Sequence, residues 1–273
     1  MKKISRTVYF VSESTGITAT SLGFSLLSQF PDVEFTHHHK PFVNTEEKAY
    51  ELVEEIQKET HTSKNKPLIF ATMTDIKINK ILEAAPCYYY ELFTRYINEI
   101  SDDIGIRPTA ISGMSHGLNN PKSYDNRMDI VNYALVHDDA MSMQNLNNAD
   151  VILLGVSRSG KTPTCLYLAL QFGLRAANYP LTEDDFLKDD IPQILKNNKE
   201  KLVGLTINPK RLAEIREKRR SASHYASRAN CKTEVRHALE LFNRYELNIF
   251  DTSSSSIEEL SARIMQLIRK TSP

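Results

Sequence analysis

Residues 149–162 read ADVILLGVSRSGKT, and this stretch decides the fold class of the chain around it. The apolar run Val151–Leu154, bounded by polar residues, predicts a buried strand, and a helical pattern follows around Cys165–Phe172. Between them lies Gly155–Thr162, called the motif loop below, which fits the pattern G-x-x-x-x-G-K-[ST]. A strand, a glycine-containing loop and a helix in this order predict an α/β domain.

Units of the same kind occur elsewhere in the chain. The other expected strands are Thr7–Val11, Val33–Thr36, Pro67–Thr72, Leu202–Ile207 and Leu247–Phe250. Helical patterns follow these segments, and the one that begins at Pro209 is strongly basic. Strands that alternate with helices in this way are typical of a parallel sheet.

The motif loop has the composition that phosphate binding requires. Glycines allow the backbone to pass close to phosphate oxygens, while backbone N–H groups and the start of a helix supply positive potential. Lys161 would neutralise the outer phosphates, and Thr162 would ligate Mg²⁺. The predicted ligand is a nucleoside diphosphate or triphosphate. The residues expected to bind it are Gly155, Val156, Ser157, Arg158, Ser159, Gly160, Lys161 and Thr162.

The chain has 273 residues, which is long enough for two domains of ordinary size. Between Gly105 and Tyr124 the composition shifts toward Gly, Pro, Ser and Asn, which predicts irregular backbone between two folded units. We expect an α/β protein whose residues 1–145 form an N-terminal, Rossmann-like parallel-sheet domain with its linker. Residues 146–273 are expected to form a P-loop, kinase-like α/β domain.

The composition narrows the classes of function. Lys plus Arg number 34 and so do Asp plus Glu, so the zero formal net charge gives no electrostatic reason to bind nucleic acid or an anionic membrane. No apolar run approaches the roughly 20 residues that span a bilayer, and residues 1–3 lead into a strand pattern rather than a secretion signal. We therefore expect a cytoplasmic protein that binds neither nucleic acid nor membrane.

Cysteine and histidine usage does not indicate a disulfide framework or a metal centre. Cys87, Cys165 and Cys231 are odd in number and far apart, which favours reduced thiols. The run His37–His39 occupies consecutive positions of an expected strand, where side chains point to opposite faces. A surface strand end is therefore favoured over a metal site at this run.

The motif loop alone does not separate the classes of phosphate-binding protein. The N-K-x-D element of a GTPase and the paired acids of a motor ATPase are not found, which favours a phosphotransferase. Such an enzyme needs a group that orients or deprotonates the acceptor. The candidate catalytic residues, in addition to Lys161, are His137, Asp138 and Asp139 at the end of an expected helix. The alternative is that these three residues form a solvated helix end.

Cations that stabilise a transferred phosphoryl group are available on the basic helix. Arg211 and Arg216 are the candidate phosphate- or acceptor-binding residues there, and the alternative is a solvated, charged helix face. In the N-terminal half, a strand-to-helix loop offers a second anion site, although such loops are structurally common. Its candidate residues are Ser14, Thr15 and Gly16.

A polar segment near the C-terminus allows two interpretations. Asp251–Ser253 follows an expected strand and either lines a ligand crevice or leads into a helix cap. Ser255 or Ser256 followed by Glu258 and Glu259 resembles a capping arrangement, which favours the structural role.

Six segments together resemble one known family. They are VSESTGITA (11–19), SHGLN (115–119), ALVHDD (134–139), ADVILLGVSRSGKTPT (149–164), AANYPL (176–181) and GLTINPKRLAEIR (204–216). The chain is similar over its full length to the pyruvate, phosphate dikinase and phosphoenolpyruvate synthase regulatory proteins, and most similar to the synthase branch. Glu13 and Ala140 depart from the family, which usually has Asp at the first position and often Gly at the second.

The resemblance implies a bifunctional enzyme. Such proteins use ADP to phosphorylate a threonine of the target, which inactivates it, and use inorganic phosphate to reverse the modification with release of pyrophosphate. The family's nucleotide loop corresponds to Gly155–Thr162. We expect Lys161 and the loop amides to hold the β-phosphoryl group of ADP, or inorganic phosphate. Asp138 would act as the base to the threonine or orient the attacking phosphate.

The resemblance also implies partners. Phosphoenolpyruvate synthase is the expected protein substrate, with pyruvate, phosphate dikinase as the alternative target, and a homodimer is implied. Two rival functions remain, which are a nucleotide-sensing module without catalysis and a small-molecule kinase.

Overall fold

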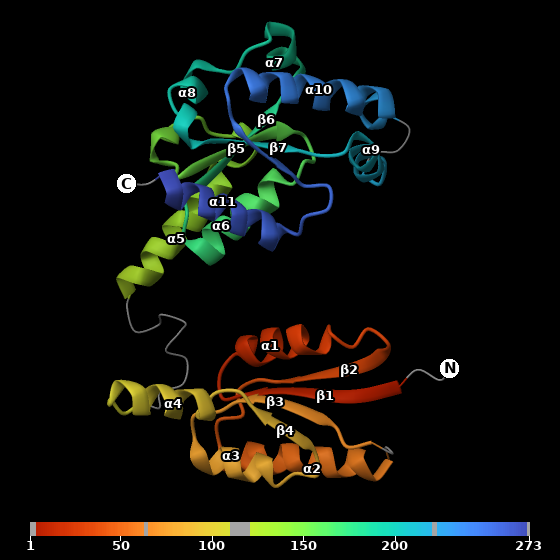
Figure 1. Cartoon of the computed structure of the whole chain (residues 1–273), viewed down its shortest axis with the longest axis vertical. Coiled ribbons are helices and arrows are strands. Elements are labelled where there is room, and N and C mark those ends of the chain that lie inside the picture. Colours follow the sequence, from red (N-terminus) through yellow and green to blue (C-terminus); the bar gives the residue numbers. More distant parts are fainter. Residues whose placement is uncertain (1–3, 63–64, 110–120, 220–222, 272–273) are drawn as a thin grey trace. The chain divides into compact units, whose positions relative to one another are not determined.

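The computed structural model describes residues 4–62, 65–109, 121–219 and 223–271, and the chain divides into two compact units. The N-terminal unit is Met1–Asn119 and the C-terminal unit is Asn120–Pro273 (Figure 1). This division lies inside the stretch rich in Gly, Pro, Ser and Asn, and it precedes the boundary expected at residues 145 and 146.

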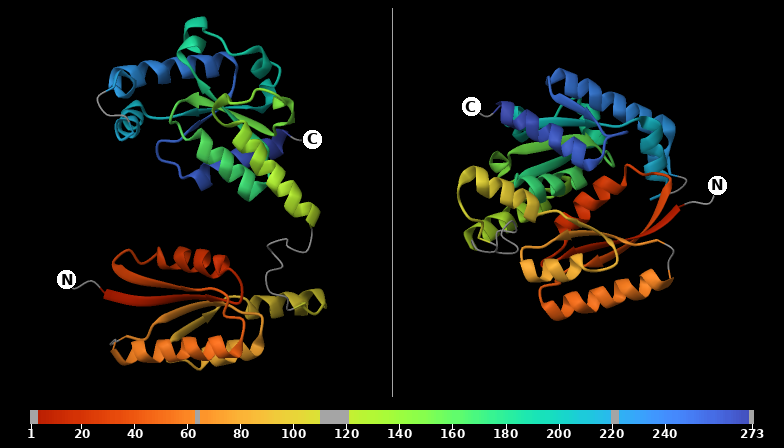
Figure 2. Two further views of the ribbon diagram at one scale, coloured as in Figure 1. Left: turned by 180° about the vertical axis from the view of Figure 1, so that it is seen from behind. Right: turned by 60° about the horizontal axis from the view of Figure 1, so that its bottom comes forward.

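The N-terminal unit is a four-stranded parallel sheet in the order β2-β1-β3-β4. Its strands are β1 (Ile4–Ser12), β2 (Val33–Lys40), β3 (Leu68–Thr72) and β4 (Tyr88–Glu91). Its helices are α1 (Ile17–Leu27), α2 (Glu46–Thr62), α3 (Ile76–Glu83) and α4 (Thr94–Ile104). Helix α1 covers one face of the sheet, and α2 and α3 cover the other (Figures 1 and 2).

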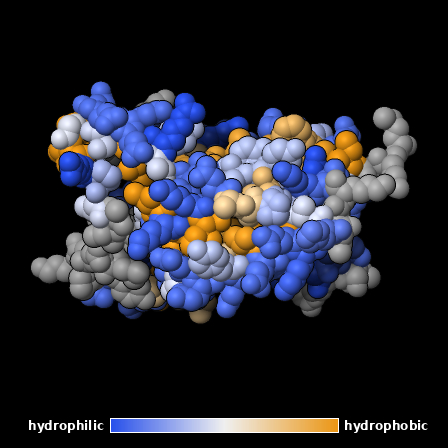
Figure 3. Space-filling view, turned by 90° about the horizontal axis from the view of Figure 1, so that it is seen from below, coloured by the Kyte–Doolittle hydropathy of each residue, from blue (hydrophilic) through white to orange (hydrophobic). Residues whose placement is uncertain are grey.

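Each face of this sheet has its own apolar cluster. On the α1 side, Phe10 of β1 packs with Ala19 and Leu27 of α1. On the other side, α2 buries Leu52 and Ile56, which lie four residues apart on one helix face. Figure 3 shows an outer face of the molecule on which hydrophilic side chains predominate around a central group of apolar ones.

The C-terminal unit is a second four-stranded parallel sheet, in the order β6-β5-β7-β8. Its strands are β5 (Val151–Val156), β6 (Ala176–Leu181), β7 (Leu202–Thr206) and β8 (Asn248–Asp251). Its helices are α5 (Pro121–Val136), α6 (Lys161–Phe172), α7 (Glu183–Lys188), α8 (Gln193–Lys196), α9 (Pro209–Glu217), α10 (Arg228–Arg244) and α11 (Ile257–Thr271). Short 3₁₀ turns lie at η2 (Asp138–Ala140), η3 (Leu146–Asn148), η4 (Lys199–Lys201) and η5 (His224–Ala226).

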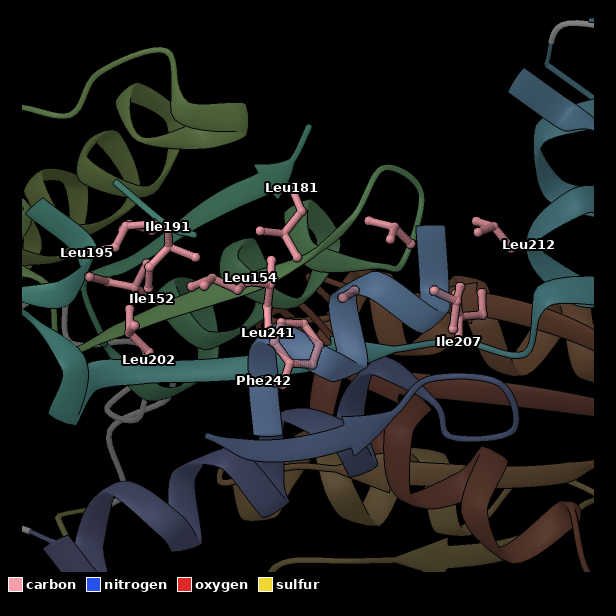
Figure 4. Packing of buried hydrophobic residues seen from close by; sticks show 14 of the residues in the cluster. Ile152, Leu154, Leu181, Ile191, Leu195, Leu202, Ile207, Leu212, Leu241 and Phe242 are labelled. Carbon is pink, nitrogen blue, oxygen red and sulfur yellow. The ribbon is translucent and has the colours of Figure 1, made fainter. Parts of the chain in front are cut away.

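The larger apolar cluster of this unit lies between the sheet and α10. Leu154 of the central strand packs with Leu241 and Phe242 of α10 (Figure 4). The opposite face of the sheet is covered by α6 and α11, where Leu168 and Ile264 are fully buried. Helix α5 belongs to this unit because Ile130 and Ala134 pack against Ala169 of α6.

The two units share one strand order. In each, the chain adds its second strand on one side of the first strand and its third strand on the other side. Ligands of open α/β sheets bind beyond the carboxyl ends of strands at this change of direction. The two positions are the carboxyl ends of β1 and β3 in the N-terminal unit and of β5 and β7 in the C-terminal unit.

The predicted α/β fold with parallel sheets is therefore confirmed, although two strands had not been expected. Both β4 and β6 lie at the edge of their sheet, where periodicity is weak. Pro180 is part of β6 because an edge strand tolerates a residue that cannot donate a backbone hydrogen bond. Across the described ranges, no helix combines the length and apolar character needed to cross a membrane.

Gly204→Ala should destabilise the C-terminal unit by about 1–3 kcal/mol through overpacking. A Cβ at this position of β7 would lie 2.7 Å from Cδ2 of Phe242, which is fully buried. Urea unfolding followed by circular dichroism measures the loss. In the double variant with Phe242→Leu the clash is relieved. The double variant should therefore lose less unfolding free energy than the sum of the losses in the two single variants. Full stability of Gly204→Ala would contradict the packing of α10 on β7.

Candidate active site

The motif loop lies at the carboxyl end of β5, a central strand of the C-terminal sheet. All six residues of β5 are buried, and α6 begins at Lys161, so the last two residues of the motif loop form the start of the helix. The first N–H groups of α6 have no acceptor within the helix and carry the positive end of its dipole. The chain thus presents a helix N-terminus at the position where open α/β sheets bind ligands.

Two glycines of the motif loop are required by its shape. Gly160 has φ +89° at the start of α6, a conformation that favours glycine. A Cβ on Gly155 would lie 2.6 Å from the carbonyl oxygen of Leu205 and 2.6 Å from Oγ of Ser159. Arg158 also has a left-handed backbone, with φ +73°, so the loop turns sharply between β5 and α6.

Lys161 places a buried cation inside the motif loop. Its side chain is almost fully buried, and its Nζ donates a hydrogen bond of 3.0 Å to the carbonyl oxygen of Val156. Burial lowers the pKa of Lys161 to about 8, while the nearby carboxylates of Asp139 and Asp138 oppose this shift. Because a carbonyl stabilises an ammonium less than an anion does, the ammonium favours an incoming phosphate.

Thr162 joins the motif loop to Asp138. Its hydroxyl donates a hydrogen bond of 2.7 Å to Oδ1 of Asp138. The side-chain amide of Asn178, on β6, donates to the same oxygen, and its Oδ1 accepts from the backbone N–H of Asp139 at 2.9 Å. Asn178 is almost fully buried and fixes Asp138 beside the loop. Sequence reasoning missed it, although a polar residue within the apolar start of β6 was a detectable signal.

The backbone around Asp138 is shaped to present the carboxylates. Asp139 and Ala140 have left-handed φ values of +47° and +58°. A glycine at position 140 would adopt this conformation more readily than alanine does, which explains why the family that the chain resembles often has glycine there. Among the charged groups that raise the pKa of Lys161, the carboxylate of Asp139 has the largest effect. The side chain of Asp139 is exposed.

His137 is buried beside this segment and is held by two backbone carbonyls. Nδ1 lies 2.8 Å from the carbonyl oxygen of Tyr133 and Nε2 lies 2.7 Å from that of Gln144. The imidazole also stacks on the ring of Tyr133, with 3.9 Å between centroids. In this arrangement neither nitrogen faces the motif loop, so His137 anchors the segment that carries Asp138.

The basic residues of α9 are divided between two environments. Arg211 is exposed in the first turn of α9, next to the cap formed by the side chain of Asn208. Arg216 is fully buried, and its NH2 donates to Glu234 at 2.6 Å and to the carbonyl oxygen of Ser157 at 3.0 Å. Arg211 is therefore accessible to a ligand, whereas Arg216 contacts protein groups. Arg220, a further basic residue of the segment that begins at Pro209, lies outside the described residues.

Ser14, Thr15 and Gly16 lie in the other unit, between β1 and α1. Gly16 has φ +77° at the start of α1. The carboxylate of the neighbouring Glu13 is buried and accepts from the backbone N–H groups of Thr74 at 2.8 Å and Asp75 at 2.6 Å. The residues predicted as a second anion site thus lie beside a fixed carboxylate.

The polar segment after β8 leads into a helix cap, as the sequence favoured. The N–H of Ser256 donates to Glu259 Oε2 at 3.1 Å, and the N–H of Glu259 donates to Ser256 Oγ at 3.2 Å. Thr252 nevertheless lies close to the motif loop, because its Cγ2 is 4.0 Å from the position of a Cβ on Gly160. Within the described ranges, no group of three or more His, Cys, Asp or Glu residues is placed to hold a metal ion.

Comparisons with known proteins extend over almost the whole chain. Residues 8–265 match the family model described as kinase/pyrophosphorylase. A protein of Thiocapsa roseopersicina is 46% identical over 266 residues, which cover 97% of this chain and 98% of the relative. A relative from Neisseria meningitidis serogroup B (strain MC58) is 43% identical, and the match covers 96% of this chain and 96% of the relative. A relative from Azoarcus sp. (strain BH72) is also 43% identical, and the match covers 98% of this chain and 97% of the relative. Each of the three is described as a "putative phosphoenolpyruvate synthase regulatory protein".

ADP binding should weaken at alkaline pH if Lys161 contacts its phosphates. Lys161 has a pKa of about 8 in the free chain, and a bound anion would raise that pKa. Binding above pH 8 therefore requires proton uptake, so the affinity should fall about tenfold between pH 8 and pH 9.5. Isothermal titration calorimetry across this range measures the effect.

Two variants control this pH experiment. Lys161→Met should bind ADP weakly and with no such pH dependence, because the titrating group is absent. Lys188→Met, at an exposed position of α7, should retain the pH profile of the unchanged protein. A flat profile for the unchanged protein between pH 8 and pH 9.5 would exclude Lys161 as the phosphate-binding cation.

Proposed function

The chain belongs to the kinase/pyrophosphorylase family, and from this premise we propose that it is a bifunctional regulator of phosphoenolpyruvate synthase. In one direction it is an ADP-dependent serine/threonine kinase that phosphorylates a threonine of the synthase and inactivates it. In the other it is a phosphate-dependent phosphorylase that removes this group as pyrophosphate and restores activity. The observation that carries the proposal is the buried Lys161 next to the hydrogen-bonded pair of Thr162 and Asp138.

The kinase direction transfers the β-phosphoryl group of ADP. The bond between the β-phosphorus and the oxygen that bridges to the α-phosphate breaks, and AMP leaves with that oxygen. A new bond forms between the β-phosphorus and the threonine oxygen of the target. The hydroxyl proton passes to a base, for which we propose the carboxylate of Asp138.

The phosphorylase direction uses the same protein groups, but the nucleophile is inorganic phosphate instead of the threonine hydroxyl. An oxygen of inorganic phosphate attacks the phosphorus of phosphothreonine, the bond from phosphorus to the threonine oxygen breaks, and pyrophosphate forms. The threonine oxygen regains a proton from the group that received it in the kinase direction. One loop can serve both directions because the β-phosphoryl group of ADP and inorganic phosphate offer similar oxygens to Lys161 and the loop amides.

The contacts of the site divide the tasks among its residues. Lys161 and the first N–H groups of α6 stabilise negative charge on the transferred group. Asn178 holds Asp138 in place through the amide contact to its Oδ1. The ring of His137 contacts backbone carbonyls on both sides of this segment, at Tyr133 and Gln144. Asp139 adds a second carboxylate, and Arg211 is an accessible cation for a phosphate or for the acceptor segment.

Mg²⁺ fits the chemistry of the donors beside the loop. Thr162 Oγ1 and the carboxylate of Asp138 are hard oxygen donors 2.7 Å apart, and Mg²⁺ in phosphoryl-transfer sites uses one or two carboxylates together with substrate phosphates. We propose that Thr162 holds the ion together with phosphate oxygens of the substrate, which leaves the carboxylate of Asp138 to act as the base. When bound, it would neutralise charge on the phosphate oxygens.

The choice of target rests on the names of the relatives. All three relatives reported above are named for regulation of phosphoenolpyruvate synthase. Pyruvate, phosphate dikinase is the second candidate target for the same chemistry. A homodimer remains an expectation from the resemblance.

The proposed function is tested by mixing the protein with ADP, Mg²⁺ and phosphoenolpyruvate synthase. We expect mass spectrometry to find one phosphate on a synthase threonine and the synthase to lose activity. Inorganic phosphate should then remove the modification while pyrophosphate appears. A small-molecule kinase would consume ADP without any protein acceptor. A nucleotide-sensing module would bind ADP but leave both synthase and dikinase unmodified, and either result would overturn the proposal.

Asp138→Asn should lower both activities by at least about 100-fold, because an amide cannot accept the proton. The side chain keeps its size, so the contacts with Thr162 and Asn178 can still form. Initial rates of phosphothreonine formation and of pyrophosphate release measure the effect. The control is Asp184→Asn, at an exposed position of α7, which should react as the unchanged protein does. Activities of Asp138→Asn within about threefold of the control would exclude Asp138 as the base.

A further inference from the structure

A buried arginine connects α9, α10 and the motif loop. Arg216 of α9 forms an ion pair of 2.6 Å with Glu234 of α10, and its own side chain has no exposed surface. NH1 donates to Glu234 Oε1 at 3.1 Å and to the carbonyl oxygen of Tyr225 at 3.0 Å. The guanidinium also lies over the ring of Tyr225, with 3.9 Å from Cζ to the ring centroid. These contacts fix the planar group in one orientation.

Both Arg216 and Tyr225 reach the same residue of the motif loop. NH2 of Arg216 donates to the carbonyl oxygen of Ser157 at 3.0 Å. The hydroxyl of Tyr225 donates to Oγ of Ser157 at 2.8 Å. One loop residue is therefore held at its backbone and at its side chain, by two side chains that also contact each other.

The contact with the carbonyl group of Ser157 matters for anion binding. A loop that surrounds a phosphate must direct its N–H groups inward and its carbonyl groups outward, because a carbonyl oxygen would repel the anion. Arg216 engages the carbonyl of Ser157 in the protein interior, on the side occupied by α9 and α10. The next residue, Arg158, then turns into the left-handed conformation that leads to Gly160.

We propose that Arg216 and Tyr225 are positioning residues that set the phosphate-binding conformation of the motif loop by holding Ser157. This inference rests on the proposed function, since it assigns the loop's ligand as the ADP phosphates. It gives Arg216 a different role from direct phosphate binding, because NH1 and NH2 both donate to protein acceptors. Tyr225 acts only through Ser157 and through the ring of the arginine it supports.

Glu234 makes this arrangement possible in the protein interior. A buried guanidinium without a carboxylate would be strongly unfavourable, and Glu234 is itself held by the side-chain amide of Asn230 at 2.6 Å. Removing Arg216 would leave Glu234 without its cation and threaten the fold of the unit. Tyr225→Phe is the more informative variant, because it keeps the ring under Arg216 and deletes only the hydroxyl that contacts Ser157.

The test measures ADP affinity by isothermal titration calorimetry for Tyr225→Phe, Ser157→Ala and the double variant. Loss of one hydrogen bond to the loop should weaken binding about three- to tenfold in each single variant. Both single changes break the same contact. The double variant should therefore bind ADP with the same affinity as the single variant that binds it less tightly. In the phosphorylation assay, KM for ADP should rise more than kcat falls.

Tyr245→Phe is the matched control. Its hydroxyl also donates to a side chain of the C-terminal unit, Asp190, but at the end of α10 and away from the motif loop. A general loss of stability should lower the melting temperature of both tyrosine variants, whereas only Tyr225→Phe should lose ADP affinity.

The outcomes separate this inference from the proposed function. If the unchanged protein binds neither ADP nor inorganic phosphate, the proposed function fails and this inference fails with it. If the unchanged protein binds ADP and Tyr225→Phe binds it equally well, only the positioning role is overturned. Strictly additive losses in the double variant would also overturn it, because Tyr225 would then act by a route other than Ser157.

Discussion

The hydrogen bond from Lys161 to the carbonyl oxygen of Val156 is the contact on which the candidate active site depends. An ammonium buried at the end of a central strand needs polar partners, and a single neutral carbonyl offsets only part of the free energy that burying the charge costs. The rest of the site completes its surroundings. Thr162, the next residue, is hydrogen-bonded to Asp138, and Ser157 of the same loop is held by Arg216 and Tyr225. A phosphate group that replaced Val156 as partner of Lys161 would meet donors on several sides.

The sequence predicted the centre of this site but not its supports. The motif loop could be found because its glycines, lysine and threonine occur at fixed spacing between a buried strand and a helix. Neither Asn178 nor Tyr225 belongs to a motif of this kind, and the one signal at Asn178, a polar residue in an apolar segment, did not indicate its partner. Tyr225 lies 68 residues from Ser157 in the chain, and Asn178 lies 40 residues from Asp138, so only the folded chain brings them together. The alternative interpretation, that the basic residues of α9 form one solvated face, is wrong for Arg216, because this residue is fully buried against Glu234 of α10.

The two units repeat one topology with different loop chemistry. In each, four residues join the end of the first strand to its helix, and the fourth is a glycine with a left-handed backbone. The helix then begins with Lys161 in the C-terminal unit and with Ile17 in the N-terminal unit. Sequence inspection shows no repeat because apolar cores tolerate extensive substitution while the strand order is kept. The same backbone arrangement therefore carries a buried cation in one unit and the buried carboxylate of Glu13 in the other.

The most direct test of the central claim is a crystal structure of the protein with ADP and Mg²⁺. The account predicts that the β-phosphate lies in the motif loop, that Lys161 Nζ has left the carbonyl of Val156 to contact it, and that Ser157 keeps its contacts with Arg216 and Tyr225. ADP bound elsewhere, or a Lys161 side chain still bonded to Val156 beside the bound nucleotide, would contradict the assignment of this loop as the phosphoryl-transfer site.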